Sequence, residues 1–409
     1  MGMGSSVGHG IFTNRELASE YLCTYLEEAN KTLREDGQES LSIQTRGQLW
    51  NGSLGIAWTV LQVATALSRP GDESLAREIN HLTIQGLSGV NRPFTSTSLF
   101  YGSAGFLFYL CDVVDLTGDA RDLLEKVASN WLCNLSERCE TTNKIGWSDG
   151  IGGLLGLARR LTRCEQLPEY LRSQAHEVGL DILRSIISSS QLGDPWFVPA
   201  TAMGDDPGSI HEWYVNGQYP VGVAHGAAGL LLNLSLSATQ DFEIPNLGET
   251  VEEIRSWIIK HALLDDGTFA GVVGADCVGT PDIERLIRVP NSWCNGSDGI
   301  AAALGVSLSV TSDPALALIV NRAFEATSKE PLRGGYLASG ICHGEPGLAL
   351  LRCQMNTPDA ISRTNQILSQ IKGDASPSMF LFDGTSGTAH LALNAYSGKA
   401  GGTELMLLT

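Results

Sequence analysis

The chain has 409 residues, 43% of them hydrophobic, and a formal net charge of −18. A balance this acidic argues against binding a nucleic-acid backbone, which requires clustered Lys and Arg. No run of about 20 apolar residues occurs, so no transmembrane segment is expected.

Residues 1–10 lack the basic and apolar regions of a signal peptide, and we predict that they are disordered. The nine cysteines are an odd number spread along the whole chain. In a long chain without a signal peptide, this pattern favours reduced thiols over a disulfide framework. The sequence therefore predicts a cytoplasmic protein.

A Gly-x-x-Gly element followed by an apolar run occurs seven times along the chain. The elements begin at Gly52, Gly102, Gly150, Gly226, Gly296, Gly344 and Gly384. The runs that follow, such as residues 56–67 and 230–238, are apolar on nearly all sides and are typical of buried helices. Between them lie amphipathic stretches with apolar residues at three- and four-residue spacing. These include residues 15–34, 74–87, 120–136, 167–188, 248–263 and 359–371.

Seven buried helices, each paired with an amphipathic one, predict an all-α fold. We expect an α/α toroid of seven inner and seven outer helices, forming one domain over residues 1–409 because no linker interrupts the repeat. The glycines would let adjacent inner helices begin close together at one end of the ring. No strand pattern of comparable strength is present.

The residue before the first glycine of each element falls at an expected helix N-cap. These residues are Asn51, Tyr101, Asp149, His225, Asn295, His343 and Asp383. Asn and Asp are good caps, which accounts for four of the seven, including Asp149. His225 and His343 are poor caps, so another role is expected for them.

Cys294 and Cys342 share one register, directly before the expected cap, in successive units. Because neighbouring units of a ring are neighbours in space, these thiols should meet His343 and His225 at one end of the toroid. Two sulfurs and one imidazole suit zinc, and three protein ligands leave a position open, as in catalytic sites. We predict one Zn²⁺ per chain on Cys294, Cys342 and His343, with His225 as a proton-transfer residue.

Two alternatives to this zinc site remain open at this point. The cysteines could be two buried thiols beside an incidental histidine. His225 could instead be a fourth ligand that closes the site as a structural one. His211 and His390 are expected to have structural or solvated roles.

The motifs SWCNGSDGI (292–300), GICHGEPGL (340–348) and VAHGAAGLL (223–231) resemble those of the LanC-like lanthionine cyclases. The resemblance spans about residues 45–400. It implies a seven-fold α/α toroid with a central zinc on Cys294, Cys342 and His343, and His225 as the acid/base residue. It also implies a carbon–sulfur bond-forming enzyme of the lyase class that acts on a dehydrated precursor peptide. Such a cyclase adds peptide Cys thiolates to dehydroalanine or dehydrobutyrine to form thioether rings, with a dehydratase and an exporter as candidate partners.

Three positions depart from the family pattern. Asn295 stands where members often have Tyr, and Pro290 where they usually have Arg, with Arg288 nearby but out of register. Gly146 stands where they tend to have Asp, with Asp149 close by. Arg288 and Asp149 are therefore additional candidate catalytic residues.

Residues 193–222 and 265–293 are long irregular segments that lead into His225 and Cys294. Loops of this length are often functional. The first contains aromatic residues that could contact a peptide: Trp196, Phe197, Trp213, Tyr214 and Tyr219. A lid that packs on the ring without binding anything is an equal alternative.

Two other functions remain open. One is a thiol-alkylating enzyme of the prenyltransferase kind, although such rings usually have six units and a carboxylate among the zinc ligands. The other is a LanC-like scaffold that binds zinc but has no turnover.

Overall fold

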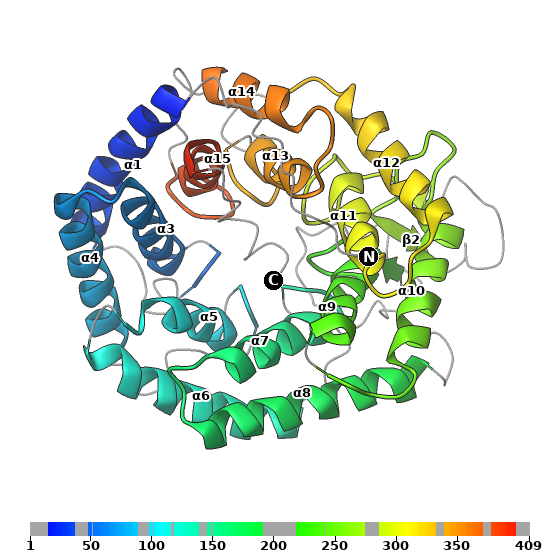
Figure 1. Cartoon of the computed structure of the whole chain (residues 1–409), viewed down its shortest axis with the longest axis horizontal. Coiled ribbons are helices and arrows are strands. Elements are labelled where there is room, and N and C mark those ends of the chain that lie inside the picture. The colour runs from blue at the N-terminus through cyan, green and yellow to red at the C-terminus, as the bar shows by residue number, and fades with distance from the viewer. Residues whose placement is uncertain are drawn as a thin grey trace.

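A computed structural model describes residues 15–36, 48–50, 52–88, 98–100, 102–115, 118–138, 145–148, 150–190, 218–240, 242–274, 286–332, 339–370 and 378–397. The helices in these ranges form two concentric rings (Figure 1). The inner ring consists of α3 (Ser53–Leu67), α5 (Ser103–Val113), α7 (Ile151–Arg163), α9 (Ala227–Gln240), α11 (Ser297–Ser307), α13 (Glu345–Gln354) and α15 (Thr385–Ser397). The outer ring consists of α1 (Arg15–Asp36), α4 (Pro70–Ser88), α6 (Gly118–Arg138), α8 (Glu169–Ser190), α10 (Leu247–Ala262), α12 (Pro314–Ser328) and α14 (Ala360–Gln370).

The predicted α/α toroid of seven inner and seven outer helices is confirmed over the described residues. The ring closes because α15 contacts both α3 and α1. One domain over residues 1–409 stays a prediction, and residues 1–10 lie outside the described ranges. None of the described helices is long and apolar enough to cross a membrane.

The burial of the two rings explains their sequence patterns. In α5 the consecutive residues 106–110 are all buried, so an inner helix contacts neighbours on every side. In α12 the buried residues are Leu316, Val320, Ala323, Phe324 and Thr327, at three- and four-residue spacing. An outer helix thus buries one stripe against the inner ring and exposes the rest.

Backbone hydrogen bonds join the turns that precede the inner helices, from the first unit to the seventh. The N–H···O distances are 3.1 Å for Leu49 to Phe100, 2.9 Å for Leu99 to Ser148, 2.8 Å for Ser148 to Ala224, 2.8 Å for Ala224 to Cys294, 3.4 Å for Cys294 to Cys342 and 2.9 Å for Cys342 to Phe382. Successive units are therefore neighbours in space, and the Cys294 turn lies between the turns of Ala224 and Cys342.

The inner helices begin one residue later than predicted. The N-caps of α3, α5, α7, α11 and α13 are the first glycines of the repeat, and none makes a side-chain cap hydrogen bond. The predicted cap at Asn295 is therefore wrong, because this residue lies in the turn before the helix. His343, for which a role other than capping was expected, lies in the equivalent turn before α13.

The second glycine of the repeat is required by a contact within each unit. A Cβ added at Gly153 would lie 1.9 Å from the Trp147 carbonyl oxygen, and one at Gly347 would lie 1.9 Å from that of Ile341. The first helical turn thus packs directly on the turn that precedes it. This contact is a second reason why glycine recurs at this position, in addition to the predicted close approach of neighbouring helices.

A small antiparallel sheet, which the sequence did not predict, joins the two long irregular segments. Strand β2 (Val272–Gly274) pairs with β1 (Gln218–Pro220) on one side and β3 (Leu286–Ile287) on the other. Tyr219 in β1 is 4% exposed and packs on Trp257 at a ring distance of 5.3 Å. It is therefore a buried residue rather than part of an exposed peptide-binding surface. The other four aromatic candidates lie outside the described residues.

His390 in α15 provides a pH test of the fold. The residue is fully buried, as a structural role requires, and burial lowers its pKa from 6.5 to about 3. Between pH 6.5 and pH 3, His390 binds a proton in the unfolded chain but not in the folded one. Its effect on the free energy of unfolding is therefore absent above pH 6.5, and the free energy falls as the pH decreases below that value. The loss should reach about 2 kcal/mol at pH 5.

Urea unfolding at pH 7.5 and pH 5 measures this loss. His390→Gln keeps a group that can hydrogen-bond Thr59, which contacts the histidine Nε2 at 3.1 Å, but does not titrate. The variant should lose about 2 kcal/mol less than the wild type between the two pH values. Equal losses would show that His390 accepts a proton in the folded state.

Candidate metal centre

Three candidate zinc ligands meet at the entry to two neighbouring inner helices. Cys294 lies in the turn before α11, and Cys342 and His343 lie in the turn before α13. Their ligand atoms all lie within 4.8 Å of one another, and the Cys342 Sγ–His343 Nε2 distance is 3.8 Å. A tetrahedral zinc with bonds of about 2.3 Å to sulfur and 2.0–2.1 Å to nitrogen requires ligand atoms roughly 3.6–3.8 Å apart. The donor set therefore fits zinc.

The electrostatics of the cluster also favour a metal. Cys294 and Cys342 are 2% and 1% exposed, whereas the His343 side chain is 48% exposed. The hydrogen bond from Cys342, followed by the contact with His343, lowers the pKa of the Cys294 thiol. Burial raises the pKa of the Cys342 thiol. The site is thus enclosed on its sulfur side and reachable past the imidazole.

Asp383 and Trp50 support the imidazole from the other side. The Asp383 Oδ1 atom lies 3.7 Å from His343 Nδ1, and Trp50 Nε1 donates a 2.6 Å hydrogen bond to Asp383 Oδ2. The Asp383 carboxylate, with a further contribution from Cys294, raises the pKa of His343 to about 10. A carboxylate on the second imidazole nitrogen fixes the orientation of a zinc-binding histidine.

The sequence interpretation missed this role of Asp383 because it treated the residue as a helix cap. A usable signal was present. Asp383 holds in unit seven the register that His343 holds in unit six, and the ring places successive units side by side. The neighbour argument that joined Cys294 to Cys342 therefore also places Asp383 beside His343.

His225 lies in the turn joined to Cys294 by the Ala224 N–H bond, and its side chain is exposed. The Ser148 Oγ atom lies 3.1 Å from His225 Nδ1 and donates its only proton to the Ala224 carbonyl at 2.8 Å. Nδ1 must then donate to Ser148, so exchange of a proton with a substrate would involve Nε2. Ser148 is a second residue that the sequence interpretation missed.

The structure gives less support to the other two catalytic candidates, Arg288 and Asp149. Arg288 forms an ion pair with Asp266, in the turn after α10, and both side chains are about half exposed. Asp149 lies outside the described residues. At Gly146 a side chain cannot fit, because an added Cβ would lie 2.3 Å from His225 Cα. The backbone of this chain therefore excludes an acidic side chain at position 146.

The sequence matches the family of lanthionine synthetase C-like proteins over residues 44–401. The chain belongs to this family. No curated protein sequence matches it. Among solved structures, nisin cyclase is similar with a TM-score of 0.77 and 16% sequence identity, covering 94% of this chain and 96% of that one. The GH76A alpha-1,6-mannanase from Salegentibacter sp. HEL1_6 is similar with a TM-score of 0.43 and 11% identity, covering 93% of this chain and 99% of that one.

At 16% identity, the similarity to nisin cyclase shows that the two proteins share the toroid fold. Membership of the lanthionine synthetase C-like family confirms the resemblance inferred from the three motifs. The motifs around Cys294, Cys342 and His225 all lie inside the matched range, so the candidate metal centre belongs to the shared family region.

Asp383→Asn should weaken zinc binding without removing it. Asparagine can still accept the Trp50 hydrogen bond but lacks the negative charge that faces His343 Nδ1. Loss of such a supporting carboxylate typically costs 10–100-fold in metal affinity. Competition with a chelator measures the affinity, and Asp72→Asn in the exposed Arg69–Asp72 pair is the matched control. Equal affinities for wild type, variant and control would remove Asp383 from the metal centre.

Proposed function

We propose that this chain is a zinc-dependent cyclase that closes thioether rings in a ribosomally made peptide. The observation that carries the proposal is the convergence of the Cys294, Cys342 and His343 ligand atoms within 4.8 Å. Membership of the lanthionine synthetase C-like family and the shared fold of nisin cyclase support it. The substrate would be a dehydrated precursor peptide.

Cys294, Cys342 and His343 would hold one zinc ion per chain. Bound zinc would supply a deprotonated, nucleophilic thiol from the substrate at neutral pH. Two thiolates and a neutral imidazole neutralise the 2+ charge and leave a fourth ligand position for that thiol. Within the described ranges, the clustered donors number three, which is consistent with an open position.

His225 would move the proton that ring closure requires. A sulfur–carbon bond forms at the β-carbon of dehydroalanine or dehydrobutyrine, the carbon–carbon π bond breaks, and the α-carbon takes up a proton. His225 Nε2 is the atom suited to deliver this proton, because Nδ1 is engaged by Ser148. The proton lost by the thiol balances the one gained, so peptide mass does not change. The choice of a dehydroamino acid as acceptor rests on the family resemblance.

A dehydratase that makes the acceptor and an exporter of the product are proposed partners. Both proposals, and the cytoplasmic location, rest on the sequence and its family resemblance. A catalytic role for Asp149 or Arg288 likewise remains a proposal.

Incubation of zinc-loaded protein with a synthetic peptide carrying one dehydrobutyrine and one cysteine tests the function. Free thiol should disappear faster than in buffer, with no change in peptide mass. Cys133→Ala, which removes an exposed thiol in α6 far from the proposed ligands in sequence, should retain full activity as a control.

The two other functions give different outcomes in this assay. A gain of mass on the peptide thiol, with an isoprenoid donor present, would support a thiol-alkylating transferase. Thiol loss no faster than in buffer, across dehydroalanine and dehydrobutyrine peptides, would leave a zinc-binding scaffold and overturn the cyclase.

A further inference from the structure

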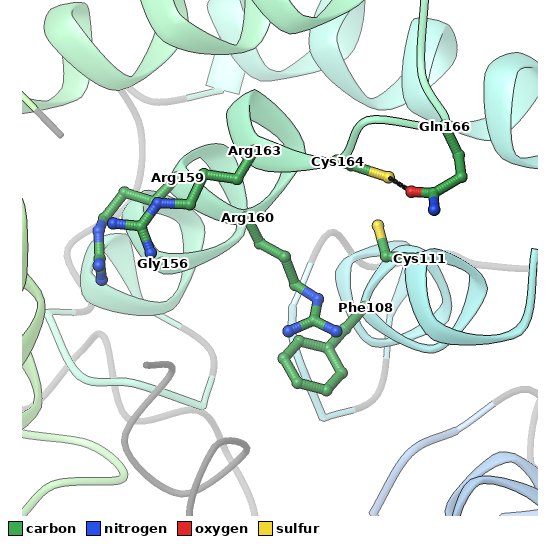
Figure 2. A pocket seen from close by; sticks show the side chains of 8 residues that line it. All are labelled: Phe108, Cys111, Gly156, Arg159, Arg160, Arg163, Cys164 and Gln166. Carbon is green, nitrogen blue, oxygen red and sulfur yellow. Dashed lines mark hydrogen bonds between the residues drawn. The ribbon is translucent and has the colours of Figure 1, made fainter. Parts of the chain in front are cut away.

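A second site with reactive groups lies far from the metal cluster. A pocket of about 240 Å³ opens between the C-terminal parts of α5 and α7. Its lining residues are Phe108, Cys111, Gly156, Arg159, Arg160, Arg163, Cys164 and Gln166 (Figure 2). The metal cluster lies at the opposite, N-terminal ends of the inner helices. Because α7 spans 13 residues, the two sites are separated by roughly 20 Å along its axis.

Two thiols face each other in this pocket. Cys111 belongs to the last turn of α5, and Cys164 is the C-cap of α7. Figure 2 shows the Cys111 sulfur directed toward Cys164, and the interaction between the two thiols shifts the pKa of each. When protonated, the Cys164 thiol donates a 3.6 Å hydrogen bond to Gln166 Oε1. Cys111 and Cys164 lie 53 residues apart in the sequence and belong to two neighbouring inner helices.

The surroundings make the two thiols unequal. Cys164 receives the hydrogen bond from Cys111, then hydrogen bonds from the Gln166 and Leu167 backbone, and has the Arg160 guanidinium nearby. Together they lower the pKa of Cys164 to about 7 against the opposing effect of burial. The same shared hydrogen bond, with burial, raises the pKa of Cys111. Cys164 is therefore the thiol of the pair whose deprotonated form is favoured.

Arg160 is held in position for this role. Its guanidinium pairs with Asp112 of α5 and lies 4.0 Å from the centroid of the Phe108 ring. Asp112 is fixed in turn by a 2.7 Å hydrogen bond from Trp58 Nε1. The Arg160 charge is thus a fixed part of the fold, and it favours the charged form of both thiols.

We propose that Cys164 and Cys111 form a hydroperoxide-reactive thiol pair, with Cys164 as the attacking thiolate and Cys111 as the resolving thiol. This combination of a stabilised thiolate, a pocket that admits a small molecule and an adjacent second cysteine is characteristic of redox-active sites. The site is independent of the metal cluster and of ring formation.

The chemistry balances in two steps. The Cys164 thiolate attacks the O–O bond of a hydroperoxide, forming a sulfenic acid and releasing an alcohol, or water when the oxidant is hydrogen peroxide. The Cys111 thiol then attacks the Cys164 sulfur, forming the S–S bond and releasing water. Overall the two thiols lose two electrons and two protons, which reduce the hydroperoxide. A dithiol reductant reverses the reaction by returning both electrons.

Peptide mapping of the full-length, zinc-loaded protein after substoichiometric hydrogen peroxide tests the proposal. A disulfide between the Cys111 and Cys164 peptides should form, with a rate that rises through the Cys164 pKa of about 7 and levels off roughly one pH unit above it, where thiolate formation is nearly complete. Cys133 is exposed on the surface and serves as the internal reference. A stabilised thiolate should react roughly three- to fourfold faster at pH 7 than an ordinary exposed thiol, because its larger thiolate fraction outweighs its lower nucleophilicity.

Two variants separate the roles of the thiols. Cys111→Ser should trap the sulfenic acid at Cys164, detected as a dimedone adduct, while Cys164→Ser should give neither adduct nor disulfide. Cys133→Ser should leave disulfide formation unchanged. If the wild-type map shows no Cys111–Cys164 disulfide, or shows Cys133 oxidised first, the proposal is overturned even where a variant fails to fold.

Discussion

Cys342→Ala should lower bound zinc to well below one ion per chain while the helical ring persists. Cys342 contributes a fully buried sulfur, 3.8 Å from His343 Nε2 and within 4.8 Å of the Cys294 sulfur. Its removal leaves two donors, which are too few to hold zinc tightly against water. The ring should survive because its core is formed by packed helices rather than by the metal, unlike a small zinc-dependent domain.

Zinc content by elemental analysis and helicity by circular dichroism measure the two effects separately. Cys294→Ala and His343→Ala should behave in the same way as Cys342→Ala. Cys133→Ala is the matched control, since it removes a thiol of the same kind from the exposed face of α6. Full zinc retention in any one ligand variant would exclude that residue from the metal centre.

His225→Asn should slow ring closure by about 10²-fold or more while leaving zinc and fold intact. Asparagine retains an N–H group for Ser148 Oγ, which lies 3.1 Å from His225 Nδ1, but cannot carry a proton to the substrate. It also occurs naturally in the same register at Asn295, so the turn before the helix accepts it. The loss should appear in the rate of thiol consumption at saturating peptide.

The zinc content of His225→Asn distinguishes the two roles that the sequence leaves open. Retained zinc with slowed ring closure identifies a proton-transfer residue. Lost zinc would make His225 a fourth ligand and remove the open position on which the mechanism depends. Ser148→Ala is the companion variant, and it should reduce the rate less, because it frees the imidazole without removing it.

The helices were predictable because their patterns are strong. The apolar run at 56–67 corresponds to α3, and the amphipathic run at 15–34 corresponds to α1. The proximity of the candidate zinc ligands was predictable because their shared register becomes spatial proximity once the repeat closes into a ring. Both the helices and the proximity of the candidate ligands thus follow from patterns that are repeated over many residues.

The parts that could not be predicted depend on single contacts. The strands have two or three residues each, too few to show alternation. The Ser148–His225 contact joins residues 77 apart through one hydroxyl group, and serine occurs too widely to mark it. The caps were misassigned because Asn and Asp before a glycine suit either a cap or a turn, and only the backbone geometry distinguishes the two.

X-ray absorption at the zinc edge tests most directly whether three protein donors hold a metal with one position open to a thiol. Wild-type protein loaded with one zinc should show two sulfur neighbours at about 2.3 Å, with the remaining ligands nitrogen or oxygen. Addition of N-acetylcysteine methyl ester, a small thiol that needs no peptide recognition, should raise the sulfur count to three. An unchanged count of two sulfurs at saturating thiol, with His225 as the fourth donor, would contradict an open catalytic site.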